Sequence, residues 1–254
     1  MLDCKLNYGE HIIRAADKAA KVVTTMGTFM AIVNGPRPCI RRILMCAFEA
    51  VILYGAGVCA EALRKENYSK RIAAVQRRGS LRIACFYRTV TKPAVLVVAG
   101  IIPIDILAQE RQFVHQQRYA FGKEEISWLA RSTSIETWQS RCDREPRDRW
   151  TARLVNRLDT WLNKEAGVVD FFLTQFLTGH GLFYSYLAKM RKVADRKCPN
   201  SDSIVDDAHR TFSYVHGGAP NDLPWSRSSE SSRRKTLSRK CCEGRTSGTG
   251  MTAT

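Results

Sequence analysis

Apolar residues recur every three or four positions along the N-terminal part of the chain, which is the spacing of amphipathic helices. The pattern predicts a first helix from His11 to about Val33, with basic residues on its other side. A second helix is expected after Asn34–Pro36, ending near Gly55–Gly57, and a third between Asn67 and Tyr87. The apolar positions predicted to bury the first helix are Ile12, Ala16, Ala19, Val23, Met26 and Met30.

Helix signals continue through the rest of the chain, and strand signals are few. Lys92–Pro93 and Pro103–Asp105 each favour a helix start, because proline suits the first turn and an aspartate suits the positive end of the helix dipole. A charged segment from Lys123 to about Lys164 spaces four tryptophans at intervals that fit no repeat. Dense apolar segments follow at Asp170–Leu177 and Phe183–Met190. The sequence therefore predicts a mainly α fold.

Changes in composition divide the chain into four segments. A helical bundle is expected over residues 1–120, with its helices from about residue 9, and a second helical region over residues 121–195. Residues 196–218 form a short cysteine- and histidine-containing segment. Residues 219–254 are rich in Ser, Arg, Thr and Gly with few large apolar side chains, which predicts a disordered basic tail.

The run Ile43–Ala60 approaches the length of a membrane span, but it contains Glu49 and two glycines and is followed at once by Glu61. These interruptions favour a buried helix in a protein without a membrane partner, and a small membrane-associated protein is the alternative. The N-terminus lacks the basic and apolar regions of a signal peptide, and the nine cysteines include no CxxC pair. We therefore expect a nuclear or cytoplasmic protein with reduced thiols.

Composition excludes wholesale disorder, because 44% of the residues are hydrophobic and 25% are charged. Lysine and arginine number 40 against 24 acidic residues, which gives a formal net charge of +16. Such an excess favours polyanionic partners through neutralisation of phosphates and release of counterions. Nucleic acid is the first class of partner that the sequence predicts, and no small-molecule substrate is indicated.

No group of residues in the sequence predicts an active site. Asp206–Asp207 is the one adjacent acid pair with an apolar residue before it, but its polar flanks cannot form the buried hairpin that a polymerase turn needs. His180 lies between two glycines without a recognisable nucleophile, so a structural histidine in a tight turn is favoured. Cys198, His209 and His216 are three ligands where structural zinc needs four, although Asp202, Asp206 or Asp207 could add an oxygen.

Seven blocks of the sequence, taken in order, resemble the C-terminal, thumb and post-thumb part of the reverse-transcriptase polyprotein of arthropod non-LTR retrotransposons. The family includes elements that insert into ribosomal DNA and their jockey-type relatives. The likeness extends over roughly residues 1–216 and ends before the tail. The blocks are Met1–Ile12, Ala50–Ala56, Val75–Arg78, Tyr87–Val90, Ala99–Arg111, the pairs Trp138–Gln139 and Trp150–Thr151, and Phe172–Gly181.

The resemblance implies that the catalytic Asp-Asp turn and the endonuclease lie upstream of this chain, so no polymerase activity is expected from it alone. The family closes this region with a cysteine/histidine zinc knuckle. Here Cys198–Pro199 is retained, Ser201 stands where the second cysteine belongs, and His209 falls near the histidine position. The resemblance thus identifies Cys198 and His209 as vestigial metal ligands, and no cofactor is expected.

A thumb region implies contact with RNA or an RNA–DNA template–primer, and the upstream catalytic half of the element as a further partner. We expect this contact to engage phosphates without reading base sequence, through basic residues of the second and third helices. An ordinary solvated helix face is an equal alternative. A decayed remnant without independent function is the alternative for the whole chain. The candidate residues are Arg37, Arg41, Arg42, Lys70, Arg71, Arg77, Arg78, Arg82 and Arg88.

Overall fold

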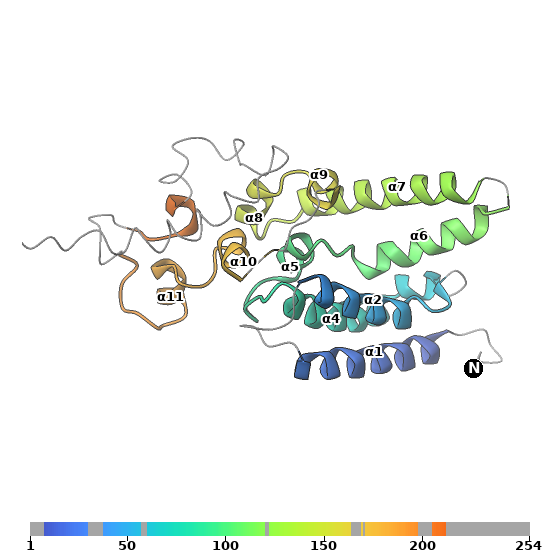
Figure 1. Ribbon diagram of the computed structural model, residues 1–254, viewed down its shortest axis with the longest axis horizontal. Coiled ribbons are helices and arrows are strands. Elements are labelled where there is room, and N and C mark those ends of the chain that lie inside the picture. The colour runs from blue at the N-terminus through green and yellow to red at the C-terminus, as the bar shows by residue number, and fades with distance from the viewer. Residues whose placement is uncertain are drawn as a thin grey trace, which may run out of the picture. The chain divides into compact units, whose positions relative to one another are not determined.

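The computed structural model describes residues 8–29, 38–56, 60–119, 122–163, 169, 171–197 and 205–211. Every regular element within these ranges is a helix, which confirms the predicted mainly α class (Figure 1). The chain divides into two compact units, one ending at Thr174 and one beginning at Gln175. The predicted tail, residues 219–254, lies outside the described residues.

Figure 1 labels the α-helices in chain order and draws the 3₁₀ helix without a label. They are α1 (Gly9–Phe29), α2 (Pro38–Ile52), the 3₁₀ helix η1 (Ala60–Arg64), α4 (Glu66–Ile83), α5 (Lys92–Ala99), α6 (Ile104–Gln117), α7 (Lys123–Asp143), α8 (Arg149–Leu154), α9 (Leu158–Asn163), α10 (Phe171–Thr178) and α11 (Tyr184–Lys189).

Helices α1, α2 and α4 pack on one another at the N-terminal end of the first unit. The predicted apolar row of α1 is confirmed at Ile12, Ala16, Ala19 and Val23, which are all buried. Gly79 of α4 permits the close approach of all three helices. A Cβ there would lie 3.2 Å from the sulfur of Met45 on α2 and 3.4 Å from Cγ2 of Val23 on α1. Met26 and Met30 lie outside the described side chains.

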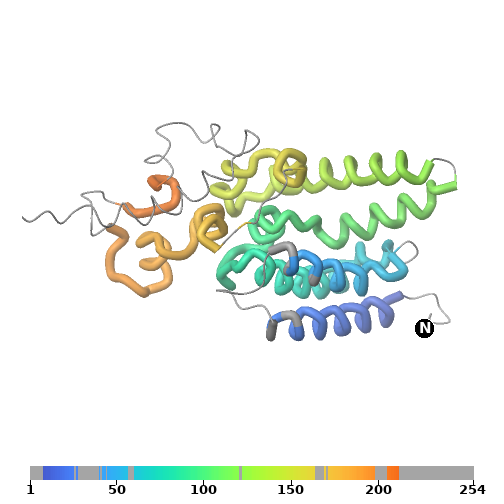
Figure 2. The backbone as a smooth tube through the Cα atoms, viewed as in Figure 1, coloured from blue at the N-terminus to red at the C-terminus, as the bar shows by residue number. Residues whose placement is uncertain are grey.

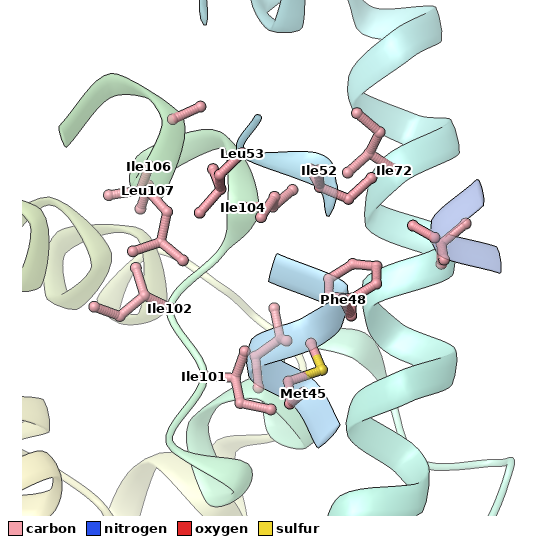
Figure 3. Packing of buried hydrophobic residues seen from close by; sticks show 14 of the residues in the cluster. Met45, Phe48, Ile52, Leu53, Ile72, Ile101, Ile102, Ile104, Ile106 and Leu107 are labelled. Atoms are coloured by element: carbon pink, nitrogen blue, oxygen red, sulfur yellow. The ribbon is translucent and has the colours of Figure 1, made fainter. Parts of the chain in front are cut away.

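Helices α6 and α7 form an antiparallel hairpin, and the chain can be followed out along α6 and back along α7 in Figure 2. Between α5 and α6 the extended segment Ile101–Pro103 is buried against the N-terminal helices. Figure 3 shows Ile104 beside Ile52 of α2 and Leu53 of the turn after it, while Ile102 lies near Leu107 of α6. The segment between two short helices is thereby part of the main core.

Both proline-based predictions of helix starts are confirmed. Pro93 occupies the first turn of α5, and α6 begins immediately after Pro103. Proline fits these positions because its fixed φ suits a helix start and the N–H that it lacks would have no partner there. Helix α5 ends at Gly100, whose φ of 65° is a conformation that glycine adopts without strain.

The apolar run predicted to be a buried helix is buried on one side only. Met45, Phe48 and Ile52 of α2 lie in the core, whereas Ile43 is 68% exposed. No single helix among the described residues is both long and apolar enough to cross a membrane. Helices α5 and α6 together meet those two criteria, with a bend of 56° at the break between them.

The first compact unit continues through residue 120, because α7 packs along α6 and also contacts α9. The segment boundaries at residues 120, 195 and 218 concern thumb-like, post-thumb and knuckle regions, and they stay predictions.

In the second unit, Ser185 N and Tyr184 N of α11 both donate to Asp206. This contact joins α11 to the segment at residues 205–211.

Candidate nucleic-acid interface

Three of the predicted phosphate-binding arginines share one edge of α4. Arg71, Arg78 and Arg82 are all exposed and are spaced by seven and then four residues, which places them on one side of a helix with 3.6 residues per turn. The opposite face of α4 is buried through Ile72 and Gln76, among other residues. The amphipathic pattern of the sequence therefore sets this basic edge outward.

Two of these arginines are engaged with α1. The Arg71 guanidinium lies 2.6 Å from a carboxylate oxygen of Asp17, and Arg82 donates a hydrogen bond of 3.2 Å to the carbonyl of Gly27. The earlier residue of α1 contacts the earlier residue of α4, and the later one contacts the later one. The two helices α1 and α4 therefore run parallel. Gly27 is within the last turn of α1, where a cation is favoured by the helix dipole.

Three further candidates also have partners within the protein. One amino group of Arg77 donates to the carbonyls of Arg88 and Val90, at 2.7 Å each, and so holds the loop that follows α4. Lys70 pairs with Glu66 one turn earlier at 2.5 Å. Arg42 donates to the carbonyl of Gly100 at 3.3 Å. These side chains therefore stabilise the fold, whereas the sequence alone identified them only as positive charges.

Arg78 and Arg88 differ from the other candidates in one respect. Their side chains are exposed, and no hydrogen bond or ion pair joins either guanidinium to another described residue. Arg88 lies in the loop whose carbonyls Arg77 holds. Arg37 is outside the described residues, and Arg41 lies in α2 with a side chain that is not described.

Gln76 is a residue whose role the sequence did not reveal. Its side chain is fully buried, its amide nitrogen donates to the carbonyl of Ile102 at 2.8 Å, and its amide oxygen accepts from the N–H of Ile104 at 3.1 Å. Two of the blocks that carry the family resemblance, Val75–Arg78 and Ala99–Arg111, are thus joined by one side chain. A polar residue within the buried face of a helix is the signal that could have identified it.

A second missed feature is a charged cluster where α2 meets the α6–α7 hairpin. Burial raises the pKa of Glu49, and the positive charges of Arg131, Arg111 and Arg42 act in the opposite direction. Arg131 also pairs with Glu110 at 2.8 Å. The signal in the sequence was Glu49 itself, a single acid within an apolar run.

The adjacent acids Asp206 and Asp207 serve as helix caps. A carboxylate oxygen of Asp206 accepts from the N–H of Tyr184, the first residue of α11, at 3.0 Å. Asp207 accepts from the N–H of Arg210 at 2.8 Å, in the short helical turn at residues 208–211. Both carboxylates therefore satisfy backbone donors that a helix start leaves unpaired.

His180 lies in a tight turn between two glycines with positive φ, as the sequence predicted. Its Nδ1 is 2.7 Å from the carbonyl oxygen of Thr178, and the centroid of its ring is 4.7 Å from that of the Tyr186 ring.

Within the part of the chain that the structure describes, no three His, Cys, Asp or Glu side chains are arranged to hold a metal. Cys198 lies outside that part, and His209 is exposed within it.

The chain is similar in sequence to proteins of arthropod retrotransposable elements. Over 222 residues, 80% of the chain, it is 24% identical to the putative 115 kDa protein in the type-1 retrotransposable element R1DM of Drosophila melanogaster. Over 221 residues it is 24% identical to the retrovirus-related Pol polyprotein from the type-1 retrotransposable element R1 2 of Nasonia vitripennis. The chain is homologous to arthropod R1 retrotransposon polyproteins. The resemblance to arthropod non-LTR retrotransposons is thereby confirmed.

The R1 relatives are longer than the region that matches. The match spans 22% of the Drosophila protein and 54% of the Nasonia polyprotein. No protein-family model matches the chain. No solved structure matches it either. The position of this R1-related region within its element stays a prediction from the sequence blocks.

Proposed function

We propose that this R1-related chain binds RNA or an RNA–DNA hybrid through the phosphate backbone, without reading base sequence. The observation that carries the proposal is the presence of two exposed guanidiniums, on Arg78 and Arg88, that no described protein group engages. The net charge of +16 supports the same class of partner. A guanidinium already in water binds phosphate without breaking a protein contact first.

The other basic residues act by positioning. Arg71 and Arg82 hold α4 along α1, so that the edge carrying Arg78 keeps its orientation. Arg77 holds the backbone of the loop that carries Arg88. Two phosphate contacts are thereby presented from elements whose spacing is fixed by packing, which lowers the entropy lost on binding.

The relatives' origin in retrotransposable elements supports this proposal, since such an element must handle its own RNA and DNA. We propose the upstream catalytic half of the element as a second partner, because the chain corresponds to only 54% of one relative and 22% of the other. Polymerase chemistry would belong to that half. Function in the nucleus or cytoplasm follows from the same proposal.

The test is binding of the full chain to a fluorescently labelled RNA–DNA hybrid over a series of salt concentrations. The double variant Arg78→Ala/Arg88→Ala is compared with Arg64→Ala/Arg153→Ala, whose side chains are also exposed and whose net charge is equal. The slope of log affinity against log salt concentration is negative. Loss of two phosphate contacts should make it shallower by about 2. The control pair should leave the slope near that of the wild type.

Two other results would contradict the proposal. Equal weakening by both double variants would mean that net charge alone attracts the hybrid. Absence of salt-dependent binding by a folded wild type would favour the alternative, a decayed element whose fold persists without a role. Circular dichroism of each variant separates loss of binding from loss of folding.

A further inference from the structure

An exposed aromatic group lies beside the loop that carries Arg88. Tyr87 is 36% exposed, and Phe172 in the first turn of α10 is 53% exposed. The two are joined through Phe171, whose ring centroid lies 6.1 Å from that of Tyr87 and 5.6 Å from that of Phe172. We call Tyr87, Phe171 and Phe172 the aromatic cluster. All three residues belong to the first compact unit.

The fold anchors the aromatic cluster at the end of α4. The hydroxyl of Thr174 on α10 donates to the carbonyl of Ala84, the residue after α4, at 2.8 Å, and this contact is buried. The loop is held as well, because the N–H of Val90 donates to the carbonyl of Tyr87 at 3.1 Å and so closes a turn around Arg88. The rings and the guanidinium are thus presented by anchored segments, which lowers the entropy lost on binding.

The rings of the aromatic cluster meet edge to face. The planes of Tyr87 and Phe171 are inclined by 62°, and those of Phe171 and Phe172 by 79°. An edge-to-face contact covers only one face of one of the two rings. With Phe172 more than half exposed, the cluster keeps aromatic surface on which a flat group can stack.

The charge beside the aromatic cluster indicates the class of ligand. A single exposed phenylalanine needs no explanation, but here the exposed rings adjoin a cation. The guanidinium of Arg88 is exposed, and no hydrogen bond or ion pair joins it to another described residue. A nucleotide carries a phosphate and a flat base in one unit, so it matches a cation next to an aromatic surface. Bases within a duplex already stack on one another, whereas an unpaired base can stack on a side chain.

We propose that the aromatic cluster binds an unpaired base of a single-stranded nucleic-acid segment whose phosphate contacts Arg88. This inference rests on the proposed binding of the nucleic-acid backbone and adds the class of ligand, a strand or a hybrid with a single-stranded extension. Stacking tolerates any base, because every base has a flat π face. The cluster therefore adds affinity for unpaired nucleotides without selecting their sequence.

The test compares the binding of two RNA–DNA hybrids to the full chain by fluorescence anisotropy. Both hybrids carry single-stranded DNA extensions of equal length at both ends, with normal bases in one hybrid and abasic sugars in the other. The number of phosphates is therefore equal, and only the unpaired bases differ. The wild type should bind the base-bearing hybrid more tightly, by about fivefold or more for one stacked base.

Replacement of the ring tests whether the aromatic cluster causes this preference. Phe172→Leu should bind the two hybrids equally, since leucine is apolar but has no ring, and Phe172→Trp should keep the preference. The matched control is Trp128→Leu on α7, because Trp128 is 72% exposed and lies outside the cluster. The control should prefer the base-bearing hybrid as the wild type does. Tyr87→Leu is a second variant that should reduce the preference, and circular dichroism verifies the folding of each variant.

Failure of this inference and failure of backbone binding give different results. Equal, salt-dependent binding of the two hybrids by the wild type would overturn the stacking of an unpaired base and leave backbone binding in place. An unchanged preference in Phe172→Leu, or its loss in Trp128→Leu, would also overturn the role of the aromatic cluster. Binding of neither hybrid by a folded wild type would overturn both proposals. Arg78→Ala/Arg88→Ala should weaken the binding of both hybrids.

Discussion

At the scale of single residues, partners rather than residue types determine what the polar side chains do. Arg71 and Arg78 are both exposed arginines on the same edge of α4, yet Arg71 is paired with Asp17. Gln76 lies on the buried face of that helix and bonds both a carbonyl and an N–H of the segment that leads into α6. An amide can donate and accept at once, so one side chain satisfies two buried backbone groups.

Replacing Gln76 by leucine should lower the free energy of unfolding by roughly 2–4 kcal/mol, because the Ile102 carbonyl and the Ile104 N–H lose their partner inside the core. Urea denaturation followed by circular dichroism measures the change. Gln109→Leu on the exposed side of α6 is the control and should change stability by less than about 0.5 kcal/mol. Similar losses in the two variants would show that the Gln76 hydrogen bonds contribute little.

At the scale of elements, α2 is the helix whose environment is most mixed. One side packs in the core, one edge carries Arg42, which donates to the carbonyl of Gly100, and Glu49, which lies near Arg111 and Arg131 of the α6–α7 hairpin, and Ile40 and Ile43 on another side are exposed. Arginines from three helices lie near enough to Glu49 in this apolar run for their positive charges to lower its pKa, against the larger effect of burial. A helix can keep a half-buried carboxylate when opposite charges stand near it, although desolvation still disfavours the ionised form.

The raised pKa of Glu49 predicts a dependence of stability on pH. The folded state holds the proton more tightly than the unfolded state, so the contribution of this group is present below pH 4.5 and is lost as pH rises through the folded-state pKa. Glu49→Gln should therefore gain stability over the wild type between about pH 4 and pH 7, as followed by urea unfolding. Glu136→Gln, an exposed site on α7, serves as the control. A constant difference across this range would contradict the prediction.

At the scale of the whole molecule, two compact units account for the described chain. The first takes its core from helices spread along its sequence and from the segment between α5 and α6. The second includes α11, which is held by the caps that Asp206 provides. The similarity to R1 retrotransposon proteins extends over 80% of the chain and therefore includes much of the first unit.

The departure from the zinc knuckle leads to a prediction about the whole chain. In the proposed alignment with the knuckle, Ser201 stands where the motif has its second cysteine, and a structural zinc site needs a closed set of four ligands. Chelation with EDTA and addition of Zn²⁺ should each leave the melting temperature unchanged in thermal scans. A rise with zinc that is lost in Cys198→Ser would show instead that the site still binds metal.

Sequence periodicity by itself determined the secondary structure of much of this protein. The apolar row of α1 and the proline starts of α5 and α6 were predicted because helix formation depends on local spacing and on the chemistry of a helix end. The ordered blocks of sequence also identified the retrotransposon relationship that the R1 homologues confirm.

Only the tertiary structure determined which polar and charged side chains have partners within the protein. The roles of Gln76, Arg82 and Glu49 depend on groups between 26 and 82 positions away in the chain, such as Ile102, Gly27 and Arg131. No local pattern encodes such partners, because packing brings them together only after the helices have formed. The same holds for the exposed side of α2, whose apolar residues look identical in sequence to those of its core.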